Sequence, residues 1–158
     1  MPRLTPNLWF DDQALDAAEF YVSVFPNSRI THVMHYTDAG PGPAGEVVAV
    51  DFELDGQPFT AINGGPHFTL DEAFSVAIDC ADQDEADHYW SVLTADGGEE
   101  SMCGWLKDRF GLSWQVVPAG LLELVNDPDR DRATRATQAM YQMRKIDIAA
   151  VRAAADGG

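Results

Sequence analysis

The chain has 158 residues, of which 46% are hydrophobic, and this length and composition suit one folded domain rather than a disordered chain. Its formal net charge of -16 makes nucleic acid and anionic membrane surfaces poor candidate partners. The sequence shows no signal peptide and no apolar run near the roughly 20 residues that span a bilayer. Two cysteines are too few for a disulfide scaffold. We therefore expect a single cytoplasmic domain over residues 1–158.

Residues 4–63 carry the pattern of one strand, one helix and three further strands. The first strand is predicted at Leu4–Phe10, and Asp11 or Asp12 can cap the helix that follows, because a carboxylate oxygen accepts the free amides of a first helical turn. Asp55-Gly56 predicts a tight hairpin, since both positions tolerate positive φ. The three further strands are predicted at Arg29–Tyr36, Glu46–Leu54 and Gln57–Asn63.

The same order of elements starts again over residues 73–117. A strand is predicted at Ala73–Cys80, and Asp82 begins a helix. Three short strands follow, at Glu99–Cys103, Trp105–Arg109 and Leu112–Val117. The sequence thus predicts an α+β fold made of two tandem βαβββ units.

Residues 121–156 form a predicted C-terminal helical segment. Its apolar residues recur at helical spacing as one stripe. Such a stripe usually packs on a sheet or on a partner subunit. The stripe consists of Ala133, Ala136, Met140 and Met143, extended by Ile146, Ile148 and Val151.

Five motifs spread over nearly the whole chain carry a resemblance to a known family. They are Thr5-Pro-Asn-Leu-Trp-Phe-Asp11, Phe20-Tyr-Val-Ser-Val-Phe-Pro-Asn-Ser-Arg-Ile30, Asn63-Gly-Gly-Pro-His-Phe68, Cys103-Gly-Trp-Leu-Lys-Asp-Arg-Phe-Gly-Leu-Ser-Trp-Gln115 and Ala139-Met-Tyr-Gln-Met-Arg-Lys-Ile-Asp-Ile148. In these motifs the chain resembles the vicinal oxygen chelate superfamily of glyoxalases, ring-cleaving dioxygenases and antibiotic-sequestering proteins. More narrowly, it is similar to the PhnB-like branch, which is labelled demethylubiquinone methyltransferase-like.

The resemblance implies a glyoxalase/dihydroxybiphenyl dioxygenase-like fold, in which the two mixed sheets curl around a cavity that often holds a metal and a small ligand. It also implies that dimers are common. The methyltransferase label is less expected to describe the activity, because binding a nucleotide-like methyl donor normally needs a glycine-rich turn from a strand into a helix. Asn63-Gly64-Gly65-Pro66 is the one candidate, and Pro66 predicts a loop there instead.

Metal-dependent members of the superfamily take His, Gln or Glu ligands from the first and last strand of each half. By resemblance, the corresponding positions here are Asn7, Asn63, Ser75 or Ala77, and Gln115. Amide and hydroxyl oxygens bind divalent transition metals weakly, so we do not expect the standard metal site. His67 and Gln115 are the weak candidates for ligands.

Two residues are weak candidates for catalysis. His67 lies in a Gly-Gly-Pro-His-Phe loop and is suited to general-base chemistry, although a loop histidine bonded to backbone or water is the alternative. Cys103 is a nucleophile only if a cation such as Lys107 lowers its pKa, and the alternative is an inert buried thiol.

The aromatic residues expected nearest the cavity are Trp9, Phe59, Phe68, Trp105 and Trp114, and strand alternation places Asn7 and Trp9 on one face. An apolar pocket with a few amide and hydroxyl anchors is typical of a small-molecule site. The predicted ligand-binding residues are Asn7, Trp9, Phe59, Asn63, His67, Phe68, Ser75, Trp105 and Gln115.

The sequence therefore predicts a homodimer that binds a small, largely apolar molecule without the usual metal. A metal-dependent lyase, isomerase or dioxygenase is the alternative, and a methyltransferase is less expected.

Overall fold

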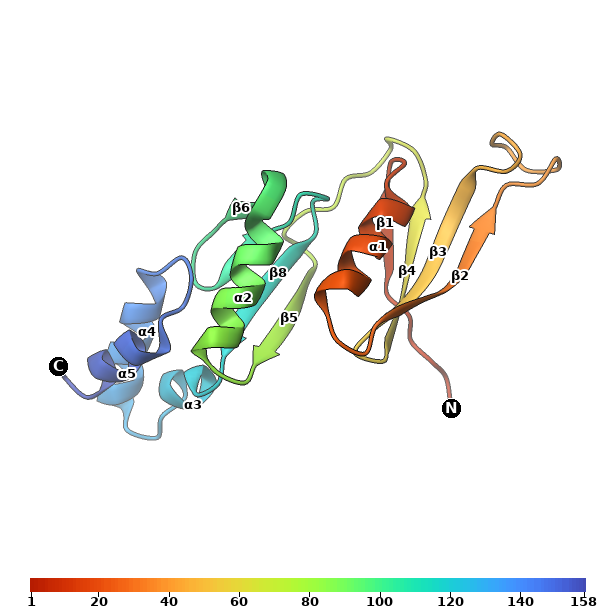
Figure 1. The fold of residues 1–158 in the computed structure, drawn as a ribbon. Helices are drawn as coiled ribbons and strands as arrows, with labels where there is room; N and C mark the ends of the chain where they lie inside the picture. Colours follow the sequence, from red (N-terminus) through yellow and green to blue (C-terminus); the bar gives the residue numbers. More distant parts are fainter. The chain divides into compact units, whose positions relative to one another are not determined.

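A computed structural model describes all residues, 1–158, and the chain divides into two compact units, Met1–Leu70 and Asp71–Gly158. Each unit holds a four-stranded mixed sheet with one long helix packed along it (Figure 1). Both sheets have the same topology, with the first strand of the unit paired in parallel to the last. The predicted α+β fold of two repeated βαβββ units is confirmed.

The first unit contains β1 (Asn7–Phe10), α1 (Ala14–Val24), β2 (Arg29–His35), β3 (Val47–Leu54) and β4 (Gln57–Asn63), and its sheet has the order β1-β4-β3-β2. Its core lies between α1 and the sheet. Three alanines on the buried face of α1 allow the helix to approach the strands closely. Tyr21 of α1 stacks on Phe52 of β3 with ring centroids 6.2 Å apart, and Phe52 stacks on Phe59 of β4 at 5.5 Å. Alternate residues of β1, β3 and β4 supply this core, as the period of two requires.

Two local features were predicted in the first unit, a hairpin turn and a helix cap, and only the turn is found. The predicted Asp55-Gly56 turn is confirmed, because both residues have positive φ, 47° and 78°, and Leu54 pairs with Gln57. The predicted aspartate cap of α1 is wrong. The residue at the cap position is Gln13, whose side chain makes no capping bond, and the Ala14 amide donates to Asn63 Oδ1 at 2.8 Å. The side-chain amide of Asn63, at the end of β4, therefore caps α1 in place of the predicted aspartate.

The second unit contains β5 (Ser75–Cys80), α2 (Gln83–Thr94), a 3₁₀ turn at Ala95–Gly97, β6 (Glu99–Glu100), β7 (Trp105–Lys107) and β8 (Ser113–Pro118), with the sheet order β5-β8-β7-β6. Asp82 caps α2 as predicted, accepting the Glu85 amide at 2.9 Å. The strand predicted at Glu99–Cys103 stops at Glu100 because Cys103 adopts a φ of 60° and its amide donates to the Met143 carbonyl at 2.7 Å.

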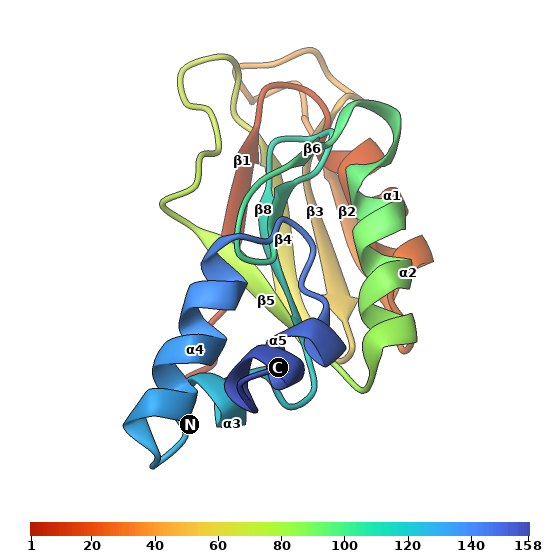
Figure 2. The same cartoon turned by 90° about the vertical axis from the view of Figure 1, so that its left-hand side faces the viewer.

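The C-terminal segment is helical, as predicted, but it forms three helices rather than one continuous stripe. These are α3 (Leu121–Val125), α4 (Arg130–Tyr141) and α5 (Ile148–Ala155), which gather at one end of the second sheet (Figure 2). They enclose a small core of their own, made of Leu121, Leu124, Ala136, Ile146, Val151 and Ala155. No helix of the chain is long and apolar enough to cross a membrane.

The non-helical stretch between α4 and α5 fastens this segment to the second unit. The carbonyls of Met143 and Arg144 accept the amides of Cys103 and Gly104 at 2.7 and 2.8 Å. Gly104 has a φ of 83°, and a Cβ there would lie 2.9 Å from the Val116 carbonyl oxygen. Only glycine fits this close approach of two backbones.

Candidate functional site

Two of the predicted site residues of the first unit, Trp9 and Phe68, meet beside the Gly64-Gly65 loop. Trp9 Nε1 donates to the Gly65 carbonyl at 2.9 Å, and the Trp9 ring meets Phe68 edge-on with centroids 4.9 Å apart. A Cβ on Gly64 would lie 2.2 Å from the indole, so glycine is needed for this packing. The next element after this loop is a strand, β5, so the predicted loop is confirmed and no helix follows the two glycines.

The structure gives three other predicted residues of the first unit, Asn63, Phe59 and Asn7, structural or surface positions. Asn63 uses both ends of its amide, because Oδ1 accepts from Ala14 and Nδ2 donates to the Val47 carbonyl at 3.2 Å. The structure also corrects the placement of Phe59. It is 5% exposed and lies on the face of the sheet that α1 covers, because its register puts it with Phe52. Asn7 is exposed, and its amide donates to the Thr5 carbonyl at 2.9 Å.

The two weak catalytic candidates lie in different units and in loops. His67 is exposed in the loop that follows β4. Cys103 is half-buried beside Met143, and the ammonium of Lys107 pairs with Glu72. The other thiol, Cys80, is buried, and this burial together with the carboxylate of Glu85 raises its pKa to about 11. A basic role for His67 and a nucleophilic role for Cys103 stay predictions.

In the second unit the predicted residues form a connected group on the face of the sheet opposite α2. Gln115 of β8 lies opposite Ala77 of β5 on one side and Trp105 of β7 on the other. Its Nε2 donates to Ser75 Oγ at 3.0 Å. Trp114, the neighbour of Gln115, points to the other face. It is 1% exposed and bonds Asp108 Oδ2 through Nε1 at 2.8 Å, so the prediction that it lies near the cavity is corrected to a core position.

A second row of polar residues lies beside this group on the same face. The strand register places Ser75, Ser113, Lys107 and Glu99 side by side across all four strands. The sequence reasoning did not name Ser113 or Glu99 as site residues, and it considered Lys107 only as a cation that could activate Cys103. The signal for Ser113 was available, because it is two residues before Gln115 on one strand and so shares its face.

Part of this row lines a pocket of about 120 Å³. The lining residues are Glu72, Glu99, Glu100, Ser101, Trp105, Leu106, Lys107 and Ser113. Ser113 is 1% exposed, and its Oγ has no hydrogen-bond partner. Lys107 and Glu72 form an ion pair, which raises the pKa of Lys107 and lowers that of Glu72. Glu100, also at the pocket, accepts from Trp90 Nε1 at 2.7 Å and lies 3.7 Å from Arg144.

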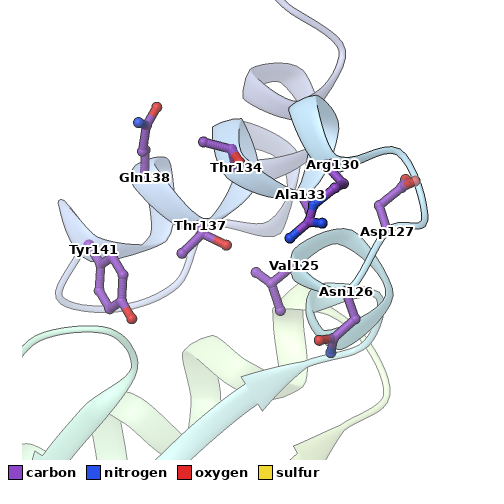
Figure 3. Close-up of a pocket in the computed structure, with 9 residues that line it drawn as sticks. All are labelled: Val125, Asn126, Asp127, Arg130, Ala133, Thr134, Thr137, Gln138 and Tyr141. Atoms are coloured by element: carbon purple, nitrogen blue, oxygen red, sulfur yellow. The ribbon is translucent and has the colours of Figure 1, made fainter.

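A wider and shallower hollow of about 450 Å³ lies beside α4 (Figure 3). Its lining comes from α4 and from the turn that follows α3, and Figure 3 shows Thr137 and Tyr141 of α4 across from Asn126. No predicted site residue lies in it. Its Asp127 carboxylate is bound to Arg132 at 3.1 Å.

The residues that the resemblance assigns to the metal positions do not suit a transition-metal centre. Gln115 is bonded to Ser75, Asn63 is bonded at both ends to backbone, and Asn7 is a surface amide. None of them brings the negative charge or the imidazole nitrogen that such ions prefer. The structure contains no group of three or more His, Cys, Asp and Glu residues placed to hold an ion.

Two βαβββ units with the same sheet topology define an α+β fold that this chain shares with a fosfomycin resistance protein. Residues 2–117 match the model of the 3-demethylubiquinone-9 3-methyltransferase family. The chain belongs to this family. Its three C-terminal helices follow the matched residues. Among curated proteins, none matches the sequence.

Solved structures agree with this assignment. The PhnB protein of Bacillus cereus, described as a 3-demethylubiquinone-9 3-methyltransferase, is 32% identical with a TM-score of 0.66, and the match covers 73% of this chain and 98% of that one. A protein from Pseudomonas aeruginosa is 18% identical with a TM-score of 0.59, covering 72% and 95%. The fosfomycin resistance protein FosX of Listeria monocytogenes, solved with manganese(II) and sulfate, is 15% identical with a TM-score of 0.52, covering 77% and 92%. The latter two show the fold alone.

Proposed function

We propose that this chain is a small-molecule-binding protein and that its ligand lies on the face of the β5–β8 sheet opposite α2. The observation that carries the proposal is the connected group of Ser75, Gln115 and Trp105, which combines two hydrogen-bonding side chains with a flat aromatic ring. A few convergent polar groups beside apolar surface are the usual composition of a small-molecule site. All three side chains are half-buried, so they are partly shielded from water and still accessible.

Fewer residues of the first unit are available to bind a ligand than the sequence predicted. Trp9 and Phe68 present aromatic surface, and Phe68 is 66% exposed. Asn63 and Phe59 are engaged in the fold itself. Within the first unit, and apart from the site on the β5–β8 sheet, we therefore propose Trp9, Phe68 and His67 as residues that contact a ligand, together with Asn7 on the same strand as Trp9.

A fragment screen by two-dimensional NMR on the full chain tests the proposal. We expect small aromatic and aliphatic probes to shift the Trp105 indole and the Gln115 side-chain amide in a saturable way. Gln115→Ala should weaken binding by about fivefold to tenfold, because it removes one hydrogen bond to the ligand. Gln138→Ala, an exposed amide on α4, is the matched control and should leave binding unchanged. If no probe moves the Trp105 and Gln115 signals, the proposal is wrong.

The family name supports a second candidate, a methyltransferase. The resemblance in sequence motifs suggests a third, a metal-dependent lyase, isomerase or dioxygenase. Calorimetry with a sulfonium methyl donor tests the second, and metal analysis with thermal-shift screening of divalent ions tests the third. Tight, stoichiometric metal binding would favour the third over our proposal.

The homodimer stays a prediction, which light scattering on the purified chain checks.

A further inference from the structure

The Ser113 hydroxyl is a buried polar group that the fold leaves without a partner. Its side chain is 1% exposed, its Oγ makes no hydrogen bond, and it lines the pocket of about 120 Å³ beside Lys107. A buried hydroxyl without a partner costs free energy, and proteins normally supply one from the chain, from water or from a ligand. The neighbouring serine, Ser75, already accepts a bond from Gln115.

The charges around this pocket favour a cation. Glu72, Glu99 and Glu100 line it together with a single base, Lys107. Lys107 is neutralised by Glu72, and Glu100 is bound by Trp90 and Arg144. Glu99 has no ion-pair partner, although it lies directly across the strand pair from Lys107. Its negative charge helps to raise the pKa of Lys107 after the larger effect of Glu72. The pocket therefore keeps an unbalanced negative charge.

We propose that this pocket binds the protonated amine of a small organic molecule. One N–H of the ammonium group donates to Ser113 Oγ, its charge is balanced by the Glu99 carboxylate, and its hydrocarbon part extends along Trp105. The inference rests on the function proposed above and adds the chemical class of the ligand. The volume is equivalent to about four water molecules, which suits an ammonium group with a few attached carbons.

Other ligand classes fit these contacts less well. An anion would meet the unbalanced carboxylate, and the base that could attract it is already paired. A quaternary ammonium has no N–H for Ser113. A metal ion would lack a suitable ligand set, since the three carboxylates that line the pocket are not placed to hold one ion together.

Titration of the isotope-labelled full chain with n-butylammonium at fixed ionic strength tests the inference. We expect saturable shifts at Ser113 and at the Trp105 indole, with a dissociation constant on the order of 1 mM, as is typical of a ligand this small. Tetramethylammonium should bind about tenfold more weakly, because it offers no hydrogen bond. n-Butanol has the same hydrocarbon chain without a charge, so it measures the contribution of the hydrocarbon. Acetate carries the opposite charge, so it tests whether binding requires a cation.

Three variants identify the contacts. Glu99→Gln should weaken n-butylammonium binding by about tenfold, and Ser113→Ala by a similar factor, since each removes a charge-assisted contact. Glu123→Gln on α3 makes the same charge change outside the pocket and should leave the affinity unchanged. Ser113→Ala should fold at least as stably as the parent chain, because it replaces an unsatisfied hydroxyl with a methyl group.

The outcomes are distinguishable. Equal binding of n-butylammonium and tetramethylammonium, or equal weakening by Glu123→Gln, would mean diffuse attraction to an acidic protein and would overturn the inference. Binding of n-butanol or acetate at Trp105 and Gln115 without binding of n-butylammonium would also overturn it and would leave the small-molecule function intact. No saturable shift with any probe would overturn both. Loss of stability in Ser113→Ala would show that the hydroxyl already makes a stabilising contact in the free protein, and it would overturn the inference.

Discussion

Asn63 has the residue type and position of a ligand anchor, yet its contacts are those of a structural residue. It ends β4, and its amide joins the start of α1 to β3 by accepting the Ala14 amide and donating to the Val47 carbonyl. Strand alternation predicts which face a side chain takes, but it does not show which backbone groups lie within reach. A side chain that satisfies two backbone groups of the fold has little capacity left for a ligand.

Replacing Asn63 should therefore reduce stability rather than ligand affinity. Asn63→Ala leaves the first amide of α1 and the Val47 carbonyl without their partners, and we expect the free energy of unfolding to fall by about 2 kcal/mol. Urea denaturation followed by circular dichroism measures this. Asn7→Ala removes an exposed amide with one local bond and should change stability by less than about 0.5 kcal/mol. Equal losses in the two variants would contradict the capping role.

The ion pair between Lys107 and Glu72 should contribute to stability only in a bounded pH range. The pKa of Glu72 is lowered from 4.5, so its contribution is present above that value and is lost as the pH falls through the lowered pKa. The pKa of Lys107 is raised from 10.5, so its contribution is present below that value and is lost as the pH rises through the raised pKa. The difference in Tm between the parent and Glu72→Gln should thus be greatest between these limits and vanish outside them. A difference that is constant with pH would show that the pair does not stabilise the fold.

At the level of elements, period-two and helical patterns predicted the type and order of nearly every strand and helix. Two element boundaries were predicted wrongly, and both depend on contacts between residues that are distant in the sequence. The β6 strand stops early because Cys103 turns toward Met143, and the C-terminal stripe breaks because Met143 and Arg144 bond to the Cys103-Gly104 backbone. These contacts join residues about forty positions apart, which local propensity cannot detect.

The candidate site was predictable to a similar extent. Ser75, Trp105 and Gln115 were found from strand periodicity together with the family resemblance, and they lie on one face. Phe59 was assigned to the wrong face because the register of β4 puts it with the core residue Phe52. Strand periodicity places Ser113 on the face of Gln115, but it does not show that the Ser113 side chain is buried. Its significance comes from the pocket and the absent partner, which only coordinates reveal.

Gln83 is the element-level contact whose removal should loosen the C-terminal helices. Its Nε2 donates to the Ile146 carbonyl at 2.9 Å and its Oε1 accepts the Ile148 amide at 2.8 Å, so one side chain of α2 holds the start of α5. Gln83→Ala should cost about 2 kcal/mol, because two backbone groups lose their partners.

Hydrogen exchange at the Ile148 amide measures this effect locally, and urea denaturation measures it globally. Exchange at Ile148 should accelerate in Gln83→Ala and stay unchanged in Gln138→Ala, whose side chain is exposed. Unaltered protection of Ile148 in Gln83→Ala would mean that the apolar core of α3, α4 and α5 holds the segment without this tie.

The whole molecule carries 26 acidic and 10 basic residues, so its carboxylates outnumber its bases by 16. The ion pairs that do form are mostly exposed, as in Arg29 with Glu53 and Arg144 with Glu100. Exposed pairs contribute little to stability, whereas repulsion among unpaired carboxylates acts over the whole surface. Repulsion should therefore be the larger electrostatic effect.

Added salt should stabilise the chain for this reason. Raising NaCl from about 10 mM to about 100 mM shortens the screening length from about 30 Å to about 10 Å, which weakens repulsion between distant carboxylates more than attraction within close pairs. We expect Tm to rise by about 2–5 °C in scanning calorimetry, the change that a gain near 1 kcal/mol produces in a chain of this size. Tetramethylammonium chloride at the same concentrations should give the same rise, because screening depends on ionic strength and not on the identity of the cation. A fall in Tm with salt would mean that the ion pairs outweigh the repulsion, and a rise with NaCl alone would mean that the fold binds sodium at a specific site.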